Sequence, residues 1–129
     1  MSVDAKKLVL VAEDHEDIRR LLEIVFTQAG YQVKTVADGR AALKEIETEK
    51  PNLVITDILM PYLNGFKLCE SIKTDPRFSS IPVIMMTAVY RQDHHVDMGF
   101  NCGADAYFSK PFQTDKVLEV AIKLMGDEK

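Results

Sequence analysis

The chain has 129 residues, 47% of them hydrophobic and 28% charged, which fits one ordinary globular domain and leaves no room for a second. Its 16 basic and 20 acidic residues give a net charge of −4, which argues against direct nucleic-acid binding and against an anionic membrane surface. No apolar run approaches the roughly 20 residues that span a bilayer, and residues 1–7 lack the apolar stretch of a signal peptide, so we expect a cytoplasmic protein.

The first half of the chain alternates short apolar runs with amphipathic segments. Leu8–Ala12 is expected to be a strand, and His15–Ala29 a helix, because apolar residues recur there with the i, i+3, i+4, i+7 spacing of one helix face. Gly30 is expected to end this helix, since glycine readily adopts the left-handed conformation of a helix cap. A second strand is predicted over Tyr31–Val36, and a second helix from Asp38 to about Lys50.

The second half continues the alternation with three more strands and three more helices. The strands are predicted over Leu53–Thr56, Ile81–Met86 and Asp105–Phe108. The third helix is expected to begin near Phe66, and the fourth, Gln92–Cys102, has only a thin apolar face. Thr114 is the predicted N-cap of the last helix.

These elements form a (βα)₅ pattern without repeats or linkers, so residues 1–129 are expected to be a single α/β domain. Strands that are apolar on both faces indicate a parallel sheet covered by helices on both sides, which is a doubly wound sheet. Ligands of such sheets bind at the carboxyl ends of the strands, near the point where the strand order reverses.

Polar residues with reactive or ligating groups stand at the ends of four of the predicted strands. They are Glu13 and Asp14, then Asp57, then Thr87, then Lys110. Parallel strands would bring these groups to one edge of the sheet, where three carboxylates repel one another unless a cation lies among them. Oxygen ligands suit Mg²⁺. A hydroxyl and an ammonium group beside the metal would hold an anion, which predicts a site that places a phosphoryl group on a carboxylate.

The same motifs, taken together, resemble those of a known family. The motifs are Glu13-Asp14, Asp57 with Met60-Pro61 after it, Thr87-Ala88, and Lys110-Pro111-Phe112. In order and spacing, and over essentially the whole chain, they are similar to the receiver domain of bacterial two-component response regulators of the chemotaxis-regulator type. The resemblance implies a flavodoxin-like three-layer sandwich with a parallel sheet of order 2-1-3-4-5.

The resemblance implies a role for each residue of the site. Asp57 would be the phosphoacceptor, attacking phosphorus as a nucleophilic carboxylate. Asp14 would bind Mg²⁺ directly and Glu13 through water, with Asp57 and the backbone carbonyl of Leu59 completing the protein ligands. The Thr87 hydroxyl and the Lys110 ammonium group would contact the remaining phosphoryl oxygens.

The resemblance also implies a switch. Phosphorylation would draw Thr87 toward the phosphoryl group, and Tyr107 would turn inward to fill the space. The face formed by the fourth helix, the fifth strand and the fifth helix would then change shape. Pro111 stands where the family has a cis-proline, which would direct Lys110 toward Asp57.

Two residues depart from the pattern of the best-known chemotaxis-type receivers. Leu59 stands two residues after Asp57, where an amide or acid is frequent, and Val89 stands two residues after Thr87. Apolar side chains at both positions cannot orient an attacking water molecule and would partly shield the phosphoryl group. We therefore expect slow self-dephosphorylation and a long-lived signal.

The implied partners are a sensor histidine kinase or a histidine phosphotransfer protein. Because 129 residues leave no room for an output domain, the output is either contact with another protein or a domain absent from this chain. The sequence allows a phosphorylation-linked dimer and does not identify the kinase or the target.

Two other functions were weighed. An aspartate-nucleophile phosphohydrolase would need a second Asp two residues after the nucleophile, where this chain has Leu59. A flavodoxin-like electron carrier would need a hydroxyl- and glycine-rich loop after the first strand to hold the FMN phosphate. This chain has Glu13-Asp14-His15-Glu16-Asp17 there, which would repel a phosphate. We expect a phosphoacceptor domain rather than an enzyme.

Overall fold

The structure is a computed structural model that describes residues 6–60, 62–87 and 103–127, with Thr87 described by its backbone. It contains a five-stranded sheet of order β2-β1-β3-β4-β5 in which every pair of neighbours is parallel. The strands are β1 (Leu8–Ala12), β2 (Gln32–Val36), β3 (Leu53–Asp57), β4 (Val83–Thr87) and β5 (Ala106–Ser109). The helices of the described residues are α1 (Glu16–Gln28), α2 (Gly39–Thr48), α3 (Gly65–Thr74) and α5 (Thr114–Leu124). The predicted α/β class and strand order are confirmed.

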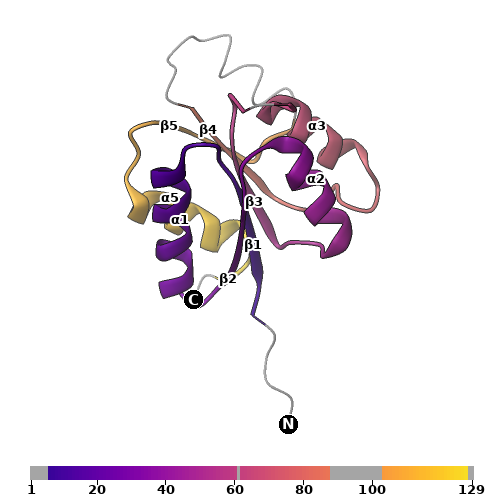
Figure 1. The fold of residues 1–129 in the computed structure, drawn as a ribbon. Coiled ribbons are helices and arrows are strands. Elements are labelled where there is room, and N and C mark those ends of the chain that lie inside the picture. The colour runs from indigo at the N-terminus through magenta and orange to yellow at the C-terminus, as the bar shows by residue number, and fades with distance from the viewer. Residues whose placement is uncertain (1–5, 61, 88–102, 128–129) are drawn as a thin grey trace.

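Helices cover both faces of the sheet, which makes three layers (Figure 1). α1 and α5 lie on one face, and α2 and α3 lie on the other. Successive residues of a strand point to opposite faces, so Val9 and Val11 pack toward α1 and α5 while Leu10 and Ala12 pack toward α2 and α3. Every residue of β1 and β3 is buried, as expected for the central strands of a parallel sheet.

Several predicted boundaries differ from the observed ones. Thr114 is the first residue of α5 rather than its N-cap; Gln113 holds the cap position, and no side-chain hydrogen bond caps the helix. β4 begins at Val83 rather than Ile81, because Pro82 has no N–H to donate and contributes only its carbonyl, which accepts from the Val54 N–H at 3.0 Å. The predicted fourth helix lies outside the described residues.

At the end of the sheet where β1 and β2 begin, polar side chains connect these strands to the residues after α5. Lys7 donates from Nζ to the Met125 carbonyl and to Asp127 Oδ1, both at 2.7 Å. The Tyr31 hydroxyl donates to Asp127 Oδ2 at 2.9 Å. These contacts attach the residues that follow α5 to the starts of β1 and β2.

Among the described residues, the structure has no helix long and apolar enough to cross a membrane.

Candidate functional site

The topology gathers the predicted site residues at one edge of the sheet. Glu13 and Asp14 directly follow β1, Asp57 is the last residue of β3, and Lys110 directly follows β5. β1 and β3 are hydrogen-bonded neighbours, and the chain runs outward from them in both directions, so these acids lie at the point where the strand order reverses. This is where doubly wound sheets bind their ligands.

Three carboxylates form a cluster at this edge. Oxygen atoms of Glu13, Asp14 and Asp57, one from each, all lie within 4.8 Å of one another. Glu13 and Asp57 are buried, whereas Asp14 is exposed, so the cluster is open to solvent on the side of Asp14. The sequence-based expectation that these acids meet therefore agrees with the structure.

Lys110 connects two members of the cluster. Its Nζ lies 2.8 Å from Oε1 of Glu13 and 3.1 Å from Oδ2 of Asp57, and only 9% of its side chain is exposed. One ammonium group against three carboxylates leaves two negative charges uncompensated if all are ionised. An oxygen-rich cluster with that excess fits a hard divalent cation such as Mg²⁺.

Glu13 is held by contacts that sequence analysis did not anticipate. Its Oε2 accepts from the backbone N–H of His15 at 3.0 Å, and its carbonyl accepts from Nη1 of Arg19 at 2.9 Å. With Lys110 on Oε1, both oxygens of this carboxylate have a donor. The only signal in the sequence was that the first helix starts directly after the acid pair, which brings helix N–H groups close to an acid.

Asp57 also has a donor on each carboxylate oxygen. Oδ1 accepts from the backbone N–H of Ile58 at 2.7 Å, and Oδ2 accepts from Lys110. The Ile58 N–H also points to the carbonyl of Met86 at 3.0 Å, which links the loop after β3 to β4. These contacts fix the orientation of the Asp57 carboxylate before any ligand binds.

The charges of the cluster change the acidity of its members. Burial raises the pKa of the Glu13 carboxyl; hydrogen bonds from Lys110 and His15 oppose this rise, and the charge of Asp57 adds to it. Burial disfavours the Lys110 ammonium group, but its hydrogen bond to Glu13 and the charges of Asp57 and Glu13 outweigh burial and raise its pKa. Lys110 is therefore a permanent cation of the site at neutral pH.

The remaining predicted residues are placed as follows. Thr87 ends β4 and pairs with Ser109 of β5, but its side chain lies outside what is described. Tyr107 is half-buried in β5, packs against the core under α2 and α3, and has its pKa raised by burial and by the charge of Asp57. The Lys110–Pro111 peptide bond is cis. Leu59 is 55% exposed, and Val89 lies outside the described residues.

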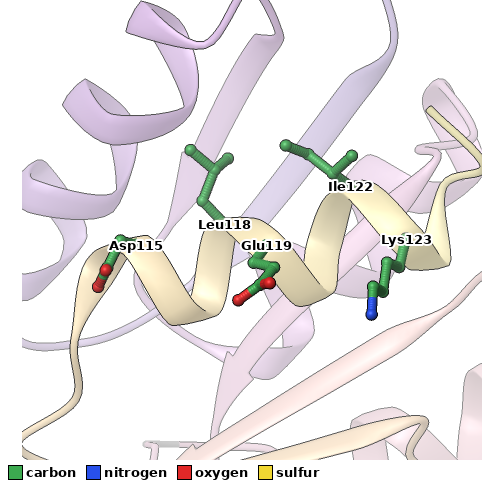
Figure 2. A pocket seen from close by; sticks show the side chains of 5 residues that line it. All are labelled: Asp115, Leu118, Glu119, Ile122 and Lys123. Atoms are coloured by element: carbon green, nitrogen blue, oxygen red, sulfur yellow. The ribbon is translucent and has the colours of Figure 1, made fainter. Parts of the chain in front are cut away.

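A cleft of about 520 Å³ opens over the cluster. It is lined by Glu13, Asp14, His15, Ile18, Asp57, Lys110 and Pro111. A smaller hollow of about 280 Å³ lies along α5, where Figure 2 shows Leu118 and Ile122 extending from one side of the helix and Glu119 and Lys123 from another. The α5 hollow shares no residue with the carboxylate cluster, whereas the cleft is lined by all three acids of that cluster.

Comparison with known proteins agrees with this geometry. The model of the response regulator receiver domain family matches residues 9–122. The probable transcriptional regulator ycf27 of Cyanophora paradoxa is 42% identical over 118 residues, which cover 92% of this chain and 47% of that protein. The chain thus spans about half the length of the curated relatives it matches.

Solved structures share the fold. A putative response regulator from Chloroflexus aurantiacus superposes with a TM-score of 0.88 at 28% identity, covering 95% of this chain and 99% of that one. The receiver domain of a sensor histidine kinase from Pseudomonas aeruginosa superposes with a TM-score of 0.85 at 24% identity, with coverage of 95% and 99%. That second structure has a magnesium ion coordinated in its active-site cleft.

Proposed function

The chain belongs to the response regulator receiver domain family, whose members act as phosphoacceptors rather than as enzymes, and we propose that it is a signalling switch phosphorylated on Asp57. The observation that carries this proposal is the buried Asp57 carboxylate, held at the end of β3 beside two further acids and the Lys110 ammonium group. Glu13 also has this cation, these neighbouring acids and a place in the cleft, but its side chain has no exposed surface, whereas 10% of the Asp57 side chain is exposed.

The proposed reaction is transfer of a phosphoryl group from a phosphohistidine to Asp57. A carboxylate oxygen of Asp57 attacks phosphorus and forms a P–O bond, while the P–N bond to the donor imidazole breaks and the imidazole takes up a proton. Lys110 stays protonated and balances charge that builds on the phosphoryl oxygens. The Thr87 hydroxyl, at the end of β4, is proposed as a further donor to those oxygens.

Asp14, Asp57, Glu13 and the carbonyl of Leu59 would hold Mg²⁺. Asp14 is the exposed acid and is assigned to direct contact with the ion, whereas Glu13, already bonded to Lys110 and His15, is assigned to contact through water. When bound, the ion would neutralise charge shared between carboxylate and phosphoryl oxygens. The magnesium in the cleft of the Pseudomonas aeruginosa receiver supports a magnesium site in this cleft.

Tyr107 is proposed as the switch aromatic together with Thr87. Its half-buried ring lies within electrostatic reach of Asp57, since the charge of Asp57 helps to raise the pKa of its hydroxyl. A change in charge at Asp57 would therefore change the electrostatic environment of Tyr107. A resulting movement of Tyr107 would alter the surface that includes β5 and α5. The predicted fourth helix, which would complete that surface, lies outside the described residues.

The partners follow from the family. We propose a sensor histidine kinase or a histidine phosphotransfer protein as the phosphodonor, and a cytoplasmic location. Residues 1–129 are proposed to form one receiver domain whose output is a partner protein or a further domain, and phosphorylation-linked dimerisation is one form such an output could take. The probable transcriptional regulator of Cyanophora paradoxa is about twice as long as the matched region, which supports a further domain as the output.

The test is intact-protein mass after incubation with acetyl phosphate, in Mg²⁺ or in chelator, for the wild type and Asp57→Asn. We expect one added phosphoryl group in the wild type, dependent on Mg²⁺ and absent from the variant. Asp75→Asn, a partly buried acid after α3 that lies outside the carboxylate cluster, serves as the control and should be phosphorylated normally. An adduct that persists in Asp57→Asn would contradict the assignment.

A further inference from the structure

The loop between β3 and α3 is packed directly against the first turn of α2. Gly39, the first residue of α2, is buried, and a methyl group added to it would overlap the backbone carbonyl oxygen of Leu63. This is a contact of backbone against backbone that only a residue without a side chain allows. Asp38 keeps that turn in place by accepting a hydrogen bond from the Ala41 N–H at 2.8 Å.

A second contact joins the same two segments. The guanidinium carbon of Arg40 lies 5.5 Å from the centroid of the Tyr62 ring, within the range of a cation–π interaction. Tyr62 is 77% exposed and has a φ of 68°, a left-handed conformation that bulky residues rarely adopt. Such a conformation persists only where neighbouring contacts impose it. At Tyr62 those contacts are Arg40 over the ring and Gly39 against Leu63, the following residue.

The start of the loop, at Asp57 and Ile58, is held by contacts with Gly65, the first residue of α3. The Gly65 N–H donates to the Ile58 carbonyl at 2.8 Å, and a methyl group at Gly65 would overlap the carbonyl oxygen of Asp57. The segment between these anchors is short, and it includes Leu59, whose carbonyl is the proposed ligand of Mg²⁺. Because few residues separate Leu59 from Tyr62 and Leu63, a displacement of Tyr62 or Leu63 should also displace the Leu59 carbonyl.

We propose that the first turn of α2, through Gly39 and Arg40, is a brace that holds the β3–α3 loop in the conformation needed at the phosphorylation site. Both are positioning residues: they act through Leu63 and Tyr62 and do not touch the carboxylate cluster. The expected consequence for Mg²⁺ binding rests on the proposed function, whereas the conformation of the loop itself does not.

The decisive variant is Arg40→Gln, because loss of the brace and loss of the positive charge predict opposite changes in Mg²⁺ affinity. Removing a positive charge from the molecule would, by electrostatics alone, strengthen binding of a cation. Loss of the brace would weaken it, and the size of a cation–π contact corresponds to about a two- to fivefold higher dissociation constant for Mg²⁺. Lys44→Gln is the matched control, since it removes the same charge from an exposed position of the same helix.

Two measurements are needed: Mg²⁺ affinity by titration calorimetry, and hydrogen exchange of the β3–α3 loop by mass spectrometry in chelator. We expect weaker Mg²⁺ binding and faster loop exchange in Arg40→Gln and a larger change in both in Gly39→Ala. Lys44→Gln should show wild-type loop exchange and Mg²⁺ binding that is equal to or slightly tighter than that of the wild type. Wild-type exchange together with unchanged or tighter Mg²⁺ binding in Arg40→Gln would overturn the proposal, even if Gly39→Ala fails to fold. If the wild type itself bound no Mg²⁺, the proposed metal site would fail, while loop exchange in chelator would still decide whether the brace exists.

Discussion

Nζ of Lys110 lies 2.8 Å from Oε1 of Glu13, a carboxylate with no exposed surface. The two residues are 97 positions apart in the chain and meet only because β1 and β5 run in the same direction and end at the same edge of the sheet. An acid buried to this degree needs a cation or a proton. Lys110 therefore has a structural role at Glu13 in addition to its proposed role at the phosphoryl group.

The first prediction concerns this ion pair. Lys110→Met keeps the length of the side chain but leaves Glu13 buried without its cation, and breaking a buried pair in this way costs about 3–5 kcal/mol. We expect a loss of that order in the free energy of unfolding, measured by urea denaturation in chelator. Lys116→Met, at an exposed position of α5, is the control and should change it by less than about 0.5 kcal/mol. Equal values for the two variants would mean that the pair contributes nothing to stability.

The second prediction concerns the proposed metal site. Mg²⁺ at ten times its dissociation constant should stabilise the wild type by about 1.4 kcal/mol, because it binds the folded state only. Asp14→Asn should lose most of this stabilisation, and in chelator it should be as stable as the wild type or more so, since one repelling charge is gone. Thermal melts with and without Mg²⁺ measure both effects. Asp17→Asn, an exposed acid in the first turn of α1, should keep the Mg²⁺ response; a full response in Asp14→Asn would exclude it as a ligand.

The third prediction concerns the lifetime of phosphorylated Asp57. The exposed Leu59 side chain cannot orient a water molecule, so we expect the wild type to keep its phosphoryl group well beyond a minute. Leu59→Asn should shorten that lifetime by supplying a polar group beside the path of the attacking water. The measurement is intact mass over time after the phosphodonor is removed.

The control for the lifetime is Leu21→Asn, the same substitution at an exposed leucine of α1. It should leave the lifetime unchanged. Decay of the wild type within seconds to a minute, with no phosphatase present, would contradict the role given to Leu59.

The fourth prediction concerns pH. Burial, the hydrogen bond to Asp127 and the charge of that residue raise the pKa of Tyr31 from 10.0 to about 12. The neutral phenol is thus favoured in the folded state, so its contribution to stability is complete below about pH 10 and is lost as the pH rises from 10 to 12. The difference corresponds to an upper limit of about 3 kcal/mol.

Ultraviolet titration of the phenolate measures this pKa directly. We expect one of the four tyrosines to titrate near pH 12, and that step to disappear in Tyr31→Phe. Asp127→Asn should lower the pKa of Tyr31, because it removes the negative charge that opposes ionisation. A Tyr31 that titrates near pH 10 in the folded wild type would contradict the hydrogen bond between Tyr31 and Asp127.

The strands and the acids at their ends could be predicted from the sequence because both depend on local pattern. Apolar runs of strand length, such as Leu8–Ala12 and Leu53–Thr56, are buried on both faces in the structure as expected. Their direction in a parallel sheet then brings the following acids to one edge. The cap of the last helix was predicted wrongly, because Thr114 and Gln113 can each take that position and nonlocal contacts decide between them.

The sequence by itself determined the α/β class, the single sheet and the gathering of Glu13, Asp14 and Asp57, since hydrophobic periodicity and parallel strands leave few alternatives. Only the tertiary structure decided which groups those acids contact. The pairing of Lys110 with Glu13, and of Arg40 with Tyr62, depends on distances of a few ångströms between segments far apart in the chain. Such distances follow from the packing of helices and loops on the sheet, which no local pattern specifies.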